Sequence, residues 1–231
     1  MNFYETLKAK AYVHPGNVHQ IYGMLKDRVI RRKAEFDRFI YVLEQETTWF
    51  SSPASTRFHL SEHQGLLMHS VGVTKTLLEM KQHMMPQLDD ESAIICGLFH
   101  DVGKLGMPGT RLYLEGPEGY RYNPKVVSMG LGVRSLFLTS RYVTLSDDEA
   151  QAIAYHDGQY IDENHIVAHR ERPLTVLLHS ADYWTSHIFE HELMRNEFLT
   201  GKETMDVPNR GYQSRKSMRD VVEPINLLDS Y

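Results

Sequence analysis

Apolar residues recur at intervals of three and four along most of the chain, which is the spacing of an amphipathic helix. Ser146 and Glu149 form a capping-box pattern, and Pro173 suits the first turn of a helix. Strand patterns are nearly absent, so we predict an all-α fold, a helical bundle. The predicted helices cover residues 18–47 (one long or two short), 64–83, 92–102, 133–142, 146–156 and 173–184.

The predicted helix 92–102 differs from the others, because apolar residues cover nearly its whole circumference. A helix of this kind is buried. It leads into His100, Asp101, Gly103 and Lys104, so it places an imidazole and a carboxylate where a partner must satisfy them. A divalent metal ion is such a partner, since neutral imidazole and carboxylate are both good ligands.

Two segments interrupt the helical pattern. Residues 105–130 are rich in Gly and Pro and predict an irregular loop or lid, with at most a short hairpin around 112–114 and 120–122. Beyond residue 194 the chain becomes polar and weakly periodic. We therefore predict an N-terminal helical lead-in that packs on the core (1–48), a core domain (49–194) and a polar C-terminal extension (195–231).

Composition narrows the class of protein. The chain has 231 residues and a net charge of −5, so it has no overall positive charge to attract nucleic acid. The basic cluster at 26–38 fits a solvated helix face better than a phosphate-binding surface. The single cysteine, Cys96, fits a buried core thiol. With no long apolar run and no signal-peptide pattern, we expect a soluble intracellular protein without membrane contact.

Thirteen histidines make a metal site worth seeking, and four acid or imidazole side chains occupy unusually apolar helical positions. They are His69, His100, Asp101 and Asp182. One buried histidine is usually a satisfied core residue. Four such residues on three predicted helices instead favour a shared ligand.

The segments around these positions resemble the HD-domain metal-dependent phosphohydrolases, which share a histidine, a His-Asp pair and a distant aspartate. The matching segments are 65–70 (GLLMHS), 97–104 (GLFHDVGK) and 177–182 (LLHSAD), and the resemblance spans roughly residues 50–190. The run 52–59 (SPASTRFH) is similar to bacterial and phage HD hydrolases, some of them related to HD-type 3'-5' exoribonucleases. The resemblance implies a cytoplasmic protein, of a bacterium or of the host cell if phage-encoded.

The same resemblance implies that His69, His100, Asp101 and Asp182 hold one divalent metal ion. Mn, Fe, Zn, Co, Ni and Mg are not distinguished by this ligand set. His156 matches a position that binds a second metal or contacts the substrate in larger HD sites. Relatives with two metals often carry a histidine where this chain has Leu131, so we expect one tightly held ion, with any second ion near His156 held weakly.

Phosphoester cleavage needs a base and cations. Asp101 can orient the attacking water or accept its proton. Lys104 is expected near a substrate phosphate, the alternative being a lysine that faces the helix dipole. His156 could act as an acid or contact the phosphate. The other predicted substrate contacts are Arg57, His59, His63 and Arg134.

Three functions remain open at this stage. The first is a metal-dependent phosphohydrolase that acts on a nucleotide or another small phosphate ester. The second is a phosphodiesterase or 3'-5' exonuclease on RNA or single-stranded DNA ends, which the net negative charge disfavours. The third is a non-catalytic HD nucleotide sensor or scaffold. A homo-oligomer is also left open.

Overall fold

The structure is a computed structural model that describes residues 3–8, 13–56, 59–117 and 119–191. Arg57 and the predicted extension 195–231 lie outside these residues. The α-helices are α1 (Phe3–Lys8), α2 (Val18–Lys26), α3 (Lys33–Glu46), α4 (Gly65–Met84), α5 (Asp90–Phe99), α6 (Leu131–Ser140), α7 (Asp147–Tyr155) and α8 (Pro173–Trp184). Shorter elements are η1 (Val102–Leu105), η2 (Gly158–Tyr160), η3 (Asp162–Val167), η4 (Thr185–Phe189), β1 (Gly106–Met107), β2 (Thr110–Arg111), β3 (Tyr113–Gly116) and β4 (Gly119–Tyr122).

The predicted all-α fold is confirmed, with some shifted boundaries. The pattern at 18–47 forms two helices, α2 and α3. The buried helix ends at Phe99 instead of 102, because His100 caps it and Asp101 leaves the helical conformation (φ −113°). The segment 157–171, expected to be a loop, contains the 3-10 turns η2 and η3. The predicted hairpin is β3–β4, and the Ser146–Glu149 capping box is present.

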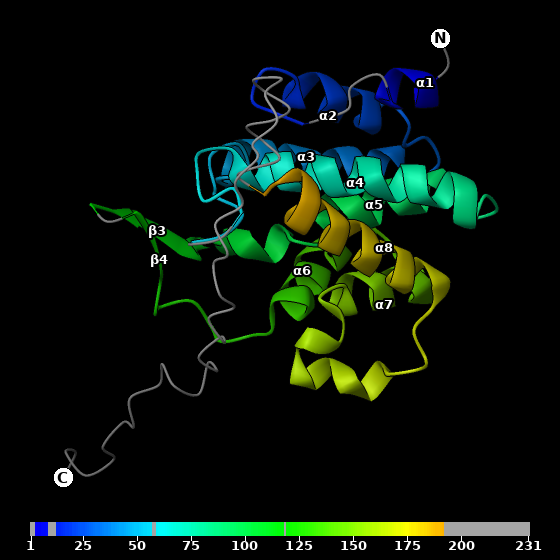
Figure 1. Cartoon of the computed structure of the whole chain (residues 1–231). Coiled ribbons are helices and arrows are strands. Elements are labelled where there is room, and N and C mark those ends of the chain that lie inside the picture. The colour runs from blue at the N-terminus through cyan, green and yellow to red at the C-terminus, as the bar shows by residue number, and fades with distance from the viewer. Residues whose placement is uncertain (1–2, 9–12, 57–58, 118, 192–231) are drawn as a thin grey trace, which may run out of the picture.

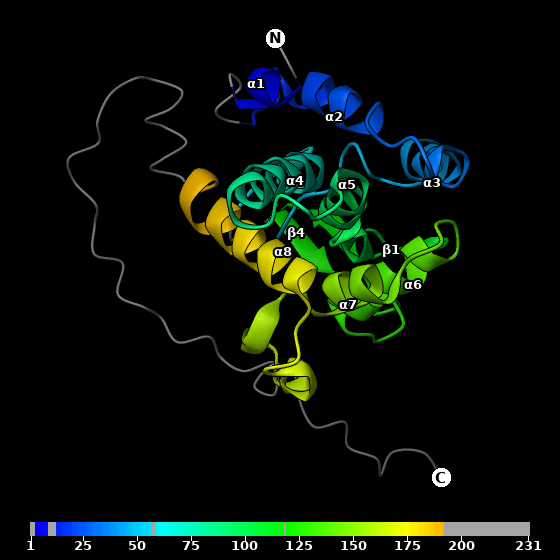
Figure 2. The ribbon, with the colours of Figure 1, turned by 90° about the vertical axis from the view of Figure 1, so that its right-hand side faces the viewer.

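Helix α4 lies at the centre of the bundle (Figures 1 and 2). Helices α5 and α8 pack against it, α7 packs against both α5 and α8, and α6 packs against α7. Helices α1 and α2 contact α4 from the other side, and the β3–β4 hairpin projects away from the bundle (Figure 1). The boundaries at 48 and 194 stay predictions. Within the described segments, no helix combines the length and the apolar character that crossing a bilayer requires.

The contact between α4 and α5 is close because Gly97 has no side chain. A Cβ atom at Gly97 would lie 2.8 Å from the Cα of Thr74 and 2.6 Å from its Oγ1. Small residues at a crossing allow helix backbones to approach in this way. Since α4 carries His69 and α5 ends at His100, this contact sets how closely the two histidines can lie.

The basic cluster at 26–38 is engaged in ion pairs. Arg32 donates to Glu91 (3.0 Å) at the start of α5, and to Glu149 (2.8 and 2.7 Å) at the start of α7. Arg31 pairs with Asp89, and Lys26 with Glu44 (2.8 Å). These cations hold helices together. The expected solvated helix face is therefore only partly right, because Arg31 and Lys33 are exposed but Arg32 is largely buried between α5 and α7.

Candidate metal centre

The four predicted ligands come together from three helices that are distant in sequence. His69 lies in the second turn of α4, His100 and Asp101 follow α5, and Asp182 lies near the end of α8. The Nε2 atom of His69 is 3.3 Å from Nε2 of His100, 3.2 Å from Oδ2 of Asp101 and 3.3 Å from Oδ1 of Asp182. His69, His100 and Asp101 are buried, and Asp182 is partly exposed. One side of the cluster therefore reaches solvent along α8.

Asp101 also contacts two further predicted residues. Its Oδ2 accepts a hydrogen bond from Nζ of Lys104 at 2.5 Å, and its Oδ1 lies 3.5 Å from Nε2 of His156. His156 is buried, and Lys104 is nearly so. The structure therefore places one carboxylate between a cation and an array of imidazoles.

The Nδ1 atoms of the three buried histidines face acceptors in the protein. In His100 this atom donates to the carbonyl of Gly97 (2.7 Å), and in His156 to the carbonyl of Ile153 (2.9 Å). Nδ1 of His69 lies 3.1 Å from both carboxylate oxygens of Glu190. We assign the protons to Nδ1 from these partners. Nε2 of each ring faces the cluster. Against burial, the neighbouring carboxylates raise the pKa of His69 well above its usual value and that of His156 to about 9, so metal binding would displace the Nε2 protons of these two rings.

The residues present fit a divalent cation. Ligand atoms lie within 4.8 Å of one another in the set His69, His100 and Asp182, and likewise in the set His100, Asp101 and His156. Oδ1 of Asp101 is buried and makes no hydrogen bond with any described residue. An unsatisfied buried carboxylate oxygen is costly unless a partner compensates it. Both sets share His100, whose Nε2 can bind only one ion, so a second ion beside the first would be held only by Asp101 and His156, and therefore weakly.

Charge within the cluster governs its protonation. Burial by itself raises the pKa of Asp101, but Lys104 and His100 outweigh it and lower that pKa well below the usual range. The pKa of Asp182 is lowered in the same way, against burial, chiefly by His69. Both carboxylates are therefore ionised at neutral pH, the state in which they bind metal.

Glu190 is a residue of the site that the sequence reasoning missed. It is buried beneath His69, and Oε2 of Glu190 lies 3.7 Å from Nε2 of His59. The contact depends on η4, a single π-helical turn after α8 that closes with a bond from Glu190 N to Thr185 O (2.9 Å). This turn absorbs one extra residue, so Glu190, eight positions after Asp182, lies about two turns along on the same face.

The predicted substrate contacts have different environments. His59 joins the cluster: its ring centroid lies 4.9 Å from that of His69, and burial lowers its pKa to about 4, so it is neutral at pH 7. Arg134 is buried, and its guanidinium donates to the carbonyls of Gly103, Val127 and Met129 (3.1–3.3 Å). It thereby holds the segment after Asp101 in place. The predicted phosphate contact of Arg134 stays a prediction.

His63 is exposed just before α4, and among the described residues no hydrogen bond or ion pair joins it to the cluster. Its predicted role stays untested, as does that of Arg57. Leu131, the position where we expected a ligand to be missing, begins α6, and its carbonyl lies 2.7 Å from where a Cβ of Gly103 would be. A histidine at this position would thus start beside the segment that follows Asp101.

Comparison with known proteins agrees with this geometry. Neither curated proteins nor solved structures gave a match. The HD domain family model matches residues 66–184, just over half of the chain. HD domains bind divalent metals and are mostly metal-dependent hydrolases, and the matched range contains all four predicted ligands. By this match and by the assembled His-Asp cluster, the chain belongs to the HD domain family.

Proposed function

We propose that this protein is a phosphohydrolase that cleaves a phosphoester or phosphoanhydride bond of a nucleotide, using one tightly held divalent metal ion. The observation that carries the proposal is the environment of Asp101. Its Oδ1 is buried without a hydrogen bond from a described residue, its Oδ2 pairs with Lys104, and three imidazoles surround it. A structural carboxylate would be satisfied by its neighbours instead.

His69, His100, Asp101 and Asp182 would hold the metal. When bound, the metal polarises a phosphoryl oxygen and acidifies water. The donor set of imidazole and carboxylate is compatible with Mn, Fe, Zn, Co, Ni or Mg, and availability decides among them. Glu190 keeps the proton of His69 on Nδ1, which leaves Nε2 available as a ligand.

Side chains of the cluster would activate the water, neutralise charge on the phosphate and contact the substrate. Oδ1 of Asp101 can orient the attacking water and accept its proton. Lys104 stands 2.5 Å from the same carboxylate and can neutralise charge that develops on the phosphoryl oxygens. His156 faces Asp101 from α7 and serves the substrate or a weak second ion.

The first experiment is to measure the metal content of the purified protein and to screen it against dNTPs, NTPs, NMPs, cyclic nucleotides and a short RNA. We expect about one metal ion per chain and turnover of a nucleotide that Asp101→Asn abolishes. Asp148→Asn is the matched control, because Asp148 lies on the surface of α7 and pairs only with exposed Arg172 in the described structure. Preferred cleavage of the RNA would indicate the exonuclease instead.

A protein without bound metal, and without turnover when Mn and Mg are supplied, would contradict the proposal. That outcome would favour a non-catalytic HD sensor or scaffold.

A further inference from the structure

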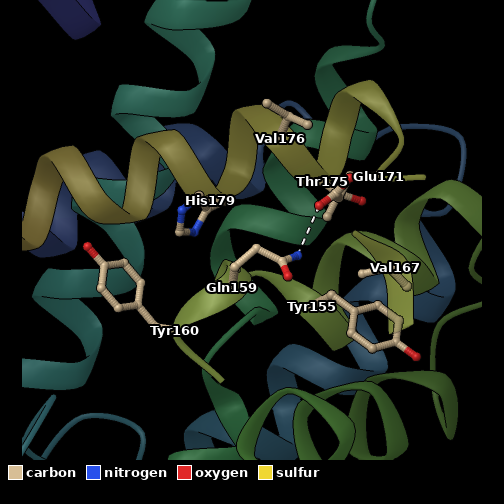
Figure 3. Close-up of a pocket in the computed structure, with 9 residues that line it drawn as sticks. Tyr155, Gln159, Tyr160, Val167, Glu171, Thr175, Val176 and His179 are labelled. Atoms are coloured by element: carbon tan, nitrogen blue, oxygen red, sulfur yellow. Dashed lines mark hydrogen bonds between the residues drawn. The ribbon is translucent and has the colours of Figure 1, made fainter. Parts of the chain in front are cut away.

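A cavity of about 360 Å³ lies beside the C-terminal end of α7 (Figure 3). Residues from the end of α7, from η2 and η3, and from the first two turns of α8 line it, among them Tyr155, Gln159, Val167, Val176 and His179. Its volume is in the range of small-molecule sites, roughly 300–1,000 Å³. The segment 157–171, which the sequence pattern presented as a loop, thus builds one wall of a possible ligand site.

His156 connects this cavity with the metal centre. The ring of His156 faces Asp101, while its carbonyl accepts a hydrogen bond from Nδ1 of His179 (2.8 Å), a cavity residue. Gly158 makes the close approach feasible. It has φ +64°, and a Cβ there would lie 2.4 Å from the His179 ring. A ligand in the cavity would therefore lie beside the backbone that positions His156.

The cavity lining is mostly apolar, and its polar groups include two acceptors. Since Nδ1 of His179 donates to His156, its Nε2 is an acceptor. The carboxylate of Glu171 is an acceptor too, and Nε2 of Gln159 holds it in place (3.0 Å; Figure 3). No Lys or Arg occurs among the described residues that line the cavity. The cavity therefore suits an uncharged group rich in N–H donors and disfavours a phosphate.

The metal centre has the opposite preference, because Lys104 and the ligand set attract phosphate. His179 and Asp182 lie on the same helix, one turn apart, or about 4.5 Å along the axis. Tyr160 lines the cavity and Tyr183 follows Asp182 on α8. Their exposed rings are nearly parallel (9°), with centroids 6.2 Å apart. One molecule with an anionic end and a flat, donor-rich end could follow this path along α8.

We infer that the cavity formed by η2, η3 and α8 binds the base of the nucleotide substrate, and that it selects a purine whose edge carries N–H donors, as guanine does. The inference depends on the proposed function only in placing the phosphate of the nucleotide at the metal centre. Glu171 would accept from the ring N–H and amino groups, and the tyrosine rings would stack on the base.

The test measures calorimetric binding of two nucleosides to the full chain as purified. A nucleoside carries no phosphate, so binding is measured without hydrolysis. Guanosine carries N–H donors on its base, whereas purine riboside has the same ring system without them. We expect guanosine to bind at least about tenfold more tightly, the worth of a hydrogen bond to a charged group. Glu171→Gln should remove most of that difference.

Two variants serve as comparisons. Glu163→Gln makes the same charge change on exposed η3, outside the cavity lining, and should leave guanosine binding unchanged. Val176→Trp, at a half-exposed position on the cavity rim, should block binding without disturbing the core. Equal binding of both nucleosides, or no binding of either to correctly folded wild-type protein, would overturn the inference.

The two proposals can fail separately. Nucleotide hydrolysis without nucleoside binding would sustain the phosphohydrolase and refute the base site. Guanosine binding that depends on Glu171, in a protein that hydrolyses nothing, would sustain the base site and refute the enzyme. If both hold, Glu171→Gln should lower by about tenfold the kcat/KM ratio between guanosine monophosphate and purine riboside monophosphate.

Discussion

Helices α5 and α7 lie side by side, and their two ends hold buried charge in opposite ways. At the N-terminal ends, Glu91 and Glu149 share Arg32, and the backbone N–H groups of residues 30, 31 and 146 also donate to these carboxylates. At the C-terminal ends, His100 and His156 face Asp101, whose Oδ1 has no described hydrogen-bond partner. The first network is complete within the protein, whereas the second requires something more.

This difference separates a structural charge cluster from a functional one. Both clusters combine carboxylates with cations or imidazoles, and both are largely buried. Carboxylates at helix N-termini are favoured by the helix dipole, and Arg32, the residue before α3, satisfies them. The distinction therefore depends on whether each polar atom is satisfied, and it can be tested by asking which cluster stabilises the fold and which binds metal.

The largest expected effect is on hydrolysis, from a change at Asp101 beside the C-terminal ends of α5 and α7. Asp101→Asn should lower hydrolysis by at least about 10³-fold, roughly 4 kcal/mol, and should deplete the bound metal. In chelator its melting temperature should fall below that of the wild type, because Lys104 loses the buried carboxylate with which it pairs. A variant that loses activity but keeps full metal content and wild-type stability would show that Asp101 is not a ligand.

At the N-terminal ends of α5 and α7, loss of the Arg32 ion pairs should reduce stability but leave metal binding unchanged. Arg32→Met should lower the free energy of unfolding by about 3 kcal/mol, because buried Glu149 loses the arginine it pairs with and Glu91 keeps only a longer contact with Arg31 (3.8 Å). Metal content per folded molecule should stay at the wild-type value. Lys33→Met is the control: its pair with Asp37 is exposed on both sides, so the loss should not exceed about 0.5 kcal/mol. Denaturant titration with metal analysis measures both quantities.

A smaller change should appear at Glu190. Replacing it with Gln removes the carboxylate that faces Nδ1 of His69, and the metal affinity should fall by about 10- to 100-fold. Competition with a chelating dye reads this affinity without any substrate. Asp at the same position should restore part of it, whereas an affinity unchanged in Glu190→Gln would show that the contact does not support the ligand.

The smallest effect concerns acid stability. Burial opposes ionisation of Glu91 and Glu149, but Arg32 outweighs it and lowers the pKa of both below 4.5. A carboxyl group with a lowered folded-state pKa stabilises the protein fully above its unfolded pKa. The stabilisation should therefore be lost as the pH falls below about 4.5, and the loss should be smaller in Arg32→Met. Equal pH dependence in denaturant titrations of the two proteins would contradict this assignment.

Much of this could be predicted from the sequence, because periodicity and burial are local properties. His69, His100, Asp101 and Asp182 stood out as polar groups in apolar helices, and the structure brings them together. Glu190 did not stand out, since it follows a π-helical turn that shifts the phase of α8, and no sequence period describes such a turn. The burial of Arg134 on backbone carbonyls likewise depends on where a distant loop passes.

The close contact at Gly97 has a consequence for motion. With no side chain between them, α4 and α5 cannot slide or separate without losing close packing near His69 and His100. Opening and closing of the site should therefore come from α8 and η4, which carry Asp182 and Glu190. Amide exchange should be slowest in α4 and α5 and faster after Trp184. The side of the centre formed by α4 and α5 would then stay rigid, while the side formed by α8 and η4 moves.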